Sequence, residues 1–107
     1  MARSPNARNQ GAFLVLMALT DGPKHGYEVA KFIEARSNGF FRMPFGTLYP
    51  VLHRLEKDGF IAGEVEDSDS EREKKIYRLT PAGRKQAQAE ASEFQLFARA
   101  INRLVPN

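Results

Sequence analysis

One run of residues, GTLYPVLHRLEKDGFI from Gly46 to Ile61, constrains the fold of this chain more than any other. Thr47 predicts a helix N-cap, because its hydroxyl oxygen can accept hydrogen bonds from N–H groups that lack partners in the first turn. Pro50 then falls in that turn, where the missing N–H of proline costs little. Gly59 predicts the helix end, since glycine adopts the left-handed conformation without a Cβ clash. The sequence therefore predicts a helix between Thr47 and Gly59.

This predicted helix has two unlike faces. At about 100° of rotation per residue, Leu48, Leu52 and Leu55 lie on one stripe with Val51 beside it, which predicts burial. The other face carries an aromatic ring, an imidazole and cations, contributed by Tyr49, Pro50, His53, Arg54 and Lys57. That composition suits contacts with phosphates and base edges. From this helix alone, an ordinary amphipathic surface helix is the open alternative.

Two strand patterns follow the helix. Residues 60–65 are predicted as one strand, and residues 75–79 as a second, in which Tyr77 and Leu79 share one face and Ile76 and Arg78 the other. The connection between them, EDSDSERE, is too polar for anything but a turn or loop. A helix followed directly by a hairpin with a long charged tip is typical of a winged helix-turn-helix.

Three blocks of the sequence resemble the PadR family of transcriptional regulators. They are HGYEVAKFI at residues 25–33, GTLYPVLHRLEKDGFI at residues 46–61 and REKKIYRLTPAG at residues 72–83, in the order and spacing of the family. The resemblance covers residues 13–85, and it departs from the family at Phe45, where a small or polar residue is common, and in the acidic wing tip. It implies a mainly α fold with a small β-wing, which is a winged helix-turn-helix with a long C-terminal helix. It also implies a repressor of transcription in which Tyr49, His53 and Arg54 face the bases of double-stranded DNA and Thr47 and Lys57 face its backbone.

Charge is segregated along the chain. Six acidic residues and one arginine between Glu64 and Glu73 give a net charge of −5, so the rest of a chain whose net charge is +3 carries +8. Cations placed against a polyphosphate release counterions, which supplies affinity for DNA of any sequence. We expect Arg72, Lys74 and Lys75 at the base of the wing to contact phosphates while the acidic tip points away. A merely solvated turn is the alternative for this insert.

The N-terminal half predicts two further helices and a loop. Residues 11–19, GAFLVLMAL, are apolar all round and predict a helix buried on more than one side. Residues 20–23 break this helix, and the positioning helix of the helix-turn-helix begins at His25 or Gly26. In the following loop, residues 38–44, we expect Phe40 and Phe41 to plug the core and Arg42 to lie near phosphate.

The last segment predicts the longest helix and a homodimer. Thr80 caps it, Pro81 occupies its first turn, and its roughly 24 residues span about 36 Å, more than a domain of this size can cover. Ala87, Phe94 and Ile101 recur every seven residues, with Phe97 and Leu104 at the alternate seam positions. A two-fold dimer would present two recognition helices to successive major grooves of a pseudo-palindromic operator. Packing against the first helix of the same chain is the alternative for this seam.

The same interface offers a site for a small aromatic effector. Phe94 and Phe97 with Phe13, beside the small residues Ala91 and Ala98, would line an apolar cleft between subunits. The resemblance implies that short members of the family bind such compounds there, some of them between tryptophans, and that Phe13 and Met17 serve the dimer as well as the fold. This chain has no tryptophan. Dry core packing is the favoured role for these phenylalanines.

Composition limits the domain organisation, the cellular location and the other functions that this chain can have. The 107 residues predict a flexible basic arm (1–10), a winged helix DNA-binding domain (11–80) and a C-terminal dimerisation helix (81–107). Without cysteine, a membrane-length apolar run or a signal-peptide pattern, a cytoplasmic protein is expected. No residue pattern predicts an enzyme or a cofactor, and His25 and His53 alone make a poor metal site. The alternative function, favoured by the acidic wing, is a winged helix that binds another protein without specific DNA binding.

Overall fold

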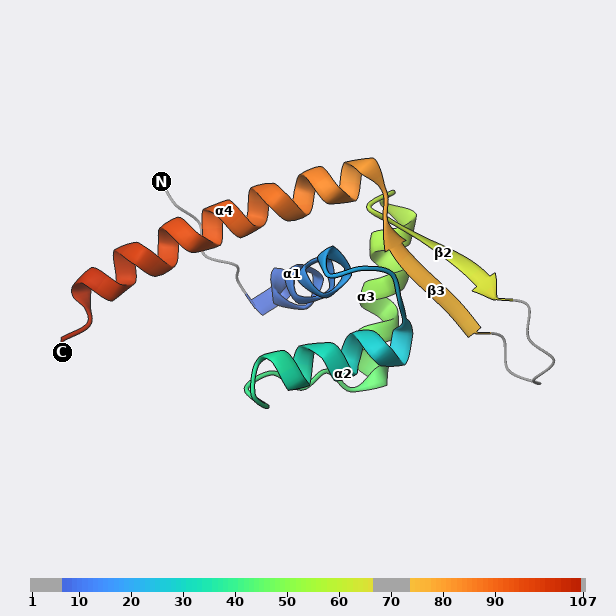
Figure 1. Cartoon of the computed structure of the whole chain (residues 1–107), viewed down its shortest axis with the longest axis horizontal. Coiled ribbons are helices and arrows are strands. Elements are labelled where there is room, and N and C mark those ends of the chain that lie inside the picture. The colour runs from blue at the N-terminus through green and yellow to red at the C-terminus, as the bar shows by residue number, and fades with distance from the viewer. Residues whose placement is uncertain (1–6, 67–73, 107) are drawn as a thin grey trace.

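Across residues 7–66 and 74–106, which the computed structural model describes, the chain forms four helices and a three-stranded antiparallel sheet (Figure 1). The elements are α1 (Ala7–Thr20), β1 (Lys24–His25), α2 (Gly26–Arg36), α3 (Phe45–Lys57), β2 (Ile61–Glu66), β3 (Lys74–Leu79) and α4 (Pro81–Leu104). The helices pack around one apolar core, and β2 and β3 project from it as the wing (Figure 1). The predicted winged helix with a long C-terminal helix is confirmed.

The helix α1 lies between α4 and α2 and is buried on several sides, as its apolar sequence predicts (Figure 1). Val15, Leu16 and Ala18 have exposed fractions of at most 1%. The helix begins at Ala7, so residues 7–10, which we assigned to a flexible arm, are helical. Once a helix is formed, each added residue gains a hydrogen bond at little further cost, so the helix extends beyond its buried part.

The helix α3 begins two residues before the predicted N-cap. Pro44 is the N-cap, in an extended conformation, and its carbonyl accepts from the N–H groups of Thr47 and Leu48 at 2.9 Å each. The prediction that Thr47 caps this helix is therefore wrong, because the fixed φ of Pro44 suits the N-cap conformation and the helix starts at the next residue. Pro50 consequently lies in the second turn, where it cannot donate to the carbonyl of Gly46.

The helices α3 and α2 end in the same way. Gly59 has a φ of 82°, and the N–H groups of Phe60 and Gly59 donate to the carbonyls of Leu55 and Glu56 at 3.0 and 3.1 Å. This Schellman motif confirms the predicted role of Gly59. At the end of α2, Asn38 adopts the left-handed conformation with a φ of 51°, which asparagine tolerates better than most residues.

The loop between α2 and α3 buries only one of the two phenylalanines that we expected to fill the core. Phe41 packs against the core and Met43 is buried, but Phe40 is 80% exposed, and its ring forms a T-shaped contact with the Phe41 ring at a centroid distance of 4.9 Å. The chain bends at Phe40, directly after the turn that ends α2, and the Phe40 ring is left in solvent while Phe41 and Met43 face the core. The prediction that Phe40 plugs the core is therefore wrong.

The sheet has the strand order β1-β3-β2. In β3, Tyr77 and Leu79 are buried while Arg78 is exposed, which confirms the predicted alternation. The strand β2 begins at Ile61, one residue later than predicted, and runs antiparallel to β3. The strand β1 was not predicted, because two residues are too few to show an alternating pattern; it pairs Lys24 with Tyr77.

The long helix α4 is anchored at its first turn. The hydroxyl of Thr80 accepts from the N–H of Gly83 at 3.0 Å, which confirms the predicted cap, and donates to the carbonyl of Gly59 at 2.6 Å. The helix α4 packs over α1 as far as Phe94, and its C-terminal end extends past the other helices (Figure 1). The molecule is consequently 55 Å long and 21 Å thick. None of the described helices combines the length and hydropathy that a membrane span requires.

Candidate nucleic-acid interface

The helix α3 presents an uncovered face opposite its buried leucines. Leu48, Leu52 and Leu55 are buried, as predicted, whereas the predicted DNA-facing residues of this helix are all exposed: Thr47, Tyr49, Pro50, His53, Arg54 and Lys57. The Arg54 side chain is 79% exposed, and its Nε lies 3.4 Å from Asp58 Oδ2. An exposed pair of this kind contributes little to stability, so Arg54 can exchange this partner for another anion.

Tyr49 also has a structural position. Its ring lies against the backbone at Gly26, the first residue of α2, where a Cβ would come within 3.2 Å of Tyr49 Cε1 and Oη. The Phe45 ring lies beside it, with the centroids 5.8 Å apart. Tyr49 therefore fills the junction of α2 and α3 with part of its ring, and 40% of the residue remains exposed.

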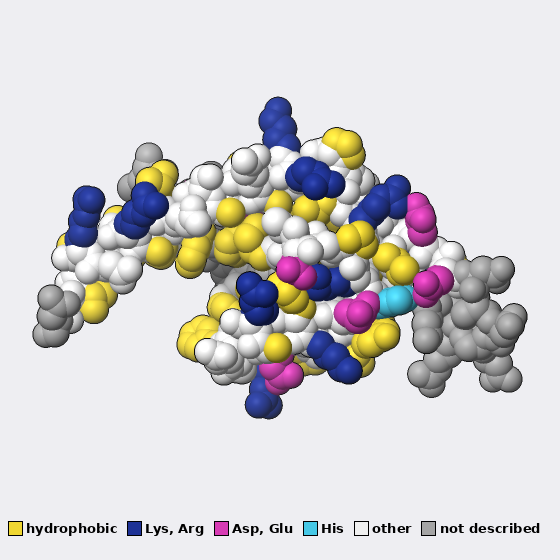
Figure 2. Space-filling view, viewed as in Figure 1, with side chains coloured by type: hydrophobic (Ala, Val, Ile, Leu, Met, Phe, Trp, Pro, Cys, Tyr) yellow, Lys and Arg dark blue, Asp and Glu magenta, His cyan; other side chains and the backbone are white. Residues whose placement is uncertain are grey.

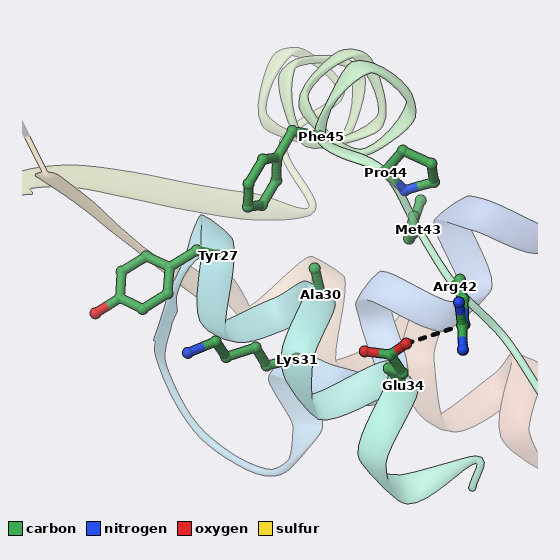
Figure 3. Close-up of a pocket in the computed structure, with 8 residues that line it drawn as sticks. All are labelled: Tyr27, Ala30, Lys31, Glu34, Arg42, Met43, Pro44 and Phe45. Atoms are coloured by element: carbon green, nitrogen blue, oxygen red, sulfur yellow. Dashed lines mark ion pairs between the residues drawn. The ribbon is translucent and has the colours of Figure 1, made fainter. Parts of the chain in front are cut away.

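A hollow of about 330 Å³ opens beside this junction (Figure 3). It is lined from α2 by Tyr27, Ala30, Lys31 and Glu34, and from the start of α3 and the preceding loop by Arg42, Met43, Pro44 and Phe45. Arg42 Nε pairs with Glu34 Oε1 at 3.1 Å on one side, and Lys31 Nζ lies 5.6 Å from the centre of the Tyr27 ring on the other. The hollow thus combines apolar walls with cations at its rim.

The wing cations differ in their surroundings. Lys75 Nζ lies 3.0 Å from Glu56 Oε1, which raises the pKa of Lys75 and ties β3 to α3. In the wing, Lys74 is the Cα partner of Glu66. Arg72 and the acidic tip lie outside the described residues. Lys75 would therefore have to leave Glu56 in order to bind a phosphate.

His25 joins the start of α2 to the end of β2, an arrangement that the sequence did not lead us to predict. Its Nδ1 lies 2.7 Å from Glu28 Oε1 and its Nε2 lies 2.9 Å from Glu66 Oε2. The hydrogen bonds to Glu66 and then to Glu28 raise the pKa of His25. Glu28 also accepts from the N–H of His25 at 2.9 Å, a helix-start contact that the H-x-x-E spacing could have indicated.

Apolar side chains continue along α4 beyond the rest of the chain. Ile101, Leu104 and Val105 are 39%, 77% and 55% exposed, and Leu96 is 62% exposed. Figure 2 shows hydrophobic side chains along the edge of α4 that faces the other helices, including its far end. The predicted heptad stripe therefore has two parts: Ala87 is buried within the chain, whereas Ile101 and Leu104 are exposed.

The predicted effector residues lie at the crossing of α1 and α4. Phe13 is 9% exposed, and its ring centroid lies 5.7 Å from that of Phe94. Met17 and Phe97 are half-buried, as are Ala91 and Ala98. None of these residues lines the hollow between α2 and α3. The contact between Phe13 and Phe94 favours packing as the role of both rings.

Comparisons with known proteins agree with this geometry. Residues 15–89 match the model of the transcriptional regulator PadR-like family. The transcriptional regulator Rv3488 of Mycobacterium tuberculosis is 36% identical over 87 residues, which cover 81% of this chain and 78% of that protein. The structure of a transcriptional regulator from Clostridium thermocellum has a TM-score of 0.80 at 29% identity, and the match covers 99% of this chain and all of that one.

A further relative has been solved with DNA. The negative transcriptional regulator PadR of Bacillus subtilis is 27% identical over 74 residues, which cover 69% of this chain and 41% of that protein. Its structure in complex with operator DNA has a TM-score of 0.66 at 26% identity, and the match covers 73% of this chain and 44% of that one. The chain is therefore a DNA-binding transcriptional regulator and not an enzyme, and it belongs to the PadR-like family.

Proposed function

We propose that this regulator represses transcription as a homodimer that places α3 of each chain in the major groove of a pseudo-palindromic operator. The observation that carries the proposal is the uncovered face of α3, where His53, Arg54 and Lys57 lie exposed opposite buried leucines. Repression is supported by the Bacillus subtilis relative, which is named a negative regulator. A helix of this kind reads bases while neighbouring cations contact phosphates.

Each side chain on α3 has a distinct proposed role. His53 and Arg54 face the bases, and Thr47 and Lys57 face the DNA backbone. Tyr49 reads bases with the exposed part of its ring while the rest holds α3 against α2. Arg72, Lys74 and Lys75 contribute phosphate contacts from the base of the wing, where Lys75 has first to exchange Glu56 for a phosphate.

The dimer is proposed from the far half of α4. A helix that leaves Leu96, Ile101 and Leu104 exposed after it has passed the other helices has apolar surface for a second chain. Two-fold symmetry would pair the two α4 helices and set the two α3 helices about one turn of DNA apart. The same interface would enclose Phe94 and Phe97. A flat aromatic effector that binds between them is a secondary proposal, because the contact of Phe94 with Phe13 gives better support to dry packing.

The test starts with a pool of random duplexes from which the protein selects its own operator. Arg54→Ala and His53→Ala should each weaken binding of the selected duplex by about 1–3 kcal/mol in fluorescence anisotropy. Arg84→Ala, which removes an exposed cation from α4, is the matched control and should bind as the parent does. Unchanged affinity in both α3 variants would refute the proposal.

Salt separates this function from its alternative, a winged helix that binds protein. Affinity for the selected duplex should fall steeply between low and moderate salt, because each phosphate contact releases counterions. A hydrophobic contact with a protein partner would change little over the same range. Selection of no preferred sequence, with a salt-insensitive protein partner, would favour the alternative.

A further inference from the structure

Phe45 is an exposed aromatic residue at the start of the recognition helix. It is the first residue of α3 and is 53% exposed, whereas Leu48, one turn further on, is completely buried. The ring therefore adds little to the core. With Tyr27 and Tyr49, which are 41% and 40% exposed, it forms an exposed aromatic patch, and a patch of this kind marks a contact with a partner.

The surroundings of Phe45 fix which way its ring projects. Figure 3 shows the ring extending from α3 toward the first half of α2, where Tyr27 and Lys31 lie. Tyr49 supports it from the next turn, at a centroid distance of 5.8 Å. Arg42, 79% exposed and paired with Glu34 at 3.1 Å, and Lys31 stand on opposite sides of the hollow that Phe45 lines. An apolar ring with cations nearby suits a DNA edge, where phosphates flank each base, provided that Arg42 exchanges Glu34 for a phosphate.

The chemistry of a phenyl ring limits what it can recognise there. It carries no hydrogen-bond donor or acceptor, so it cannot bond to base nitrogens, base oxygens or phosphates. The one apolar group that base edges present in the major groove is the 5-methyl group of thymine, and the first residues of a recognition helix are those that reach base edges. We propose that Phe45 contacts a thymine methyl group in each half-site and so makes the operator specific for thymine at that position. This inference rests on the proposed function.

The decisive probe is the duplex that the protein selects, with single thymines replaced by deoxyuridine, which removes only the methyl group. We expect one thymine in each half-site at which deoxyuridine weakens binding by about fourfold, the effect of one apolar carbon returned to water. Phe45→Ala should abolish this discrimination and bind both duplexes as the parent binds the deoxyuridine form. Phe45→Leu, which keeps an apolar side chain, should retain most of it.

Phe40→Ala is the matched control, because it removes an exposed phenylalanine from the same α2–α3 segment outside the hollow. It should discriminate thymine from deoxyuridine as the parent does. Circular dichroism establishes that all three variants are folded.

Three results would overturn the inference while leaving DNA binding intact: no thymine at which the parent senses the methyl group, full discrimination in Phe45→Ala, or loss of discrimination in Phe40→Ala. Failure of the parent to select any sequence would instead overturn the proposed function, and this inference with it.

Discussion

Lys75 Nζ of the wing lies 3.0 and 3.2 Å from the two carboxylate oxygens of Glu56 in the recognition helix. The pair neutralises Lys75 at the base of the wing, so it sets how strongly this cation attracts phosphate. Both side chains are about one-third exposed, at 36% and 30%, and water screens part of their attraction.

Glu56→Gln should therefore strengthen DNA binding at low salt. It frees Lys75 for a phosphate, so the slope of log affinity against log salt should steepen by about 1, while stability changes by less than about 1 kcal/mol. Anisotropy titrations over a salt series measure the slope. Glu90→Gln, which removes the same charge from α4, is the control, and equal slopes in both variants would show that Lys75 does not reach DNA.

The hydrogen bonds of His25 to Glu66 and Glu28 predict a pH-dependent stability. Because they raise the folded-state pKa of His25 above its ordinary 6.5, their stabilisation is complete below that value and is lost as pH rises through the folded-state pKa. Relative to His25→Gln, the parent should lose stability as the pH rises above about 6.5, a range in which the carboxylates stay ionised. Urea midpoints measured across this range test the trend.

His53→Gln provides the matched histidine for that experiment. His53 is exposed on α3, and among the described residues it forms no ion pair with a carboxylate, unlike His25. The stability difference between the parent and each variant is compared over the same pH range. If the difference from His53→Gln changes with pH as much as the difference from His25→Gln, a group other than His25 causes the trend.

Gly83 should tolerate no side chain. A Cβ at this position of α4 would lie 1.7 Å from the carbonyl oxygen of Phe60, and backbone cannot give way as a flexible side chain does. Gly83→Ala should therefore destabilise the fold by about 3 kcal/mol or more in urea denaturation. Gly46→Ala, in the first turn of α3 with nothing within 4 Å of the new Cβ, should instead stabilise by up to about 1 kcal/mol.

The far half of α4 should hold the dimer together. Ile101→Asp and Leu104→Asp place a charge on the exposed apolar stripe, and each should produce folded monomers in sedimentation because an interface core excludes unpaired charge. Phe94→Asp is less informative, since Phe94 also packs on Phe13 of the same chain. Asn102→Asp adds the same charge off the stripe and should remain dimeric. Stable dimers in the first two variants would place the interface elsewhere.

Features with a local cause could be predicted from the sequence. The buried leucines of α3, the left-handed Gly59, the alternation of β3 and the Thr80 cap each depend on residues within a few positions of one another. The start of α3 was misplaced because two capping candidates, Pro44 and Thr47, lie three residues apart and local preference favours the wrong one. The exposure of Phe40 could not be predicted, because it depends on the bend of the chain at this residue, and two adjacent phenylalanines look alike in sequence.

The amino-acid sequence by itself determined the order of the helices and of the two wing strands, their apolar residues and the family resemblance, since periodicity, caps and motif spacing are properties of short segments. Only the tertiary structure decided that His25 bonds to Glu66, 41 residues away, and that Glu56 pairs with Lys75, 19 residues away. It also decided that Phe45 is exposed. Such contacts depend on how helices and wing pack in space. Segment periodicity carries no information about that packing, because one amphipathic pattern is compatible with many neighbours.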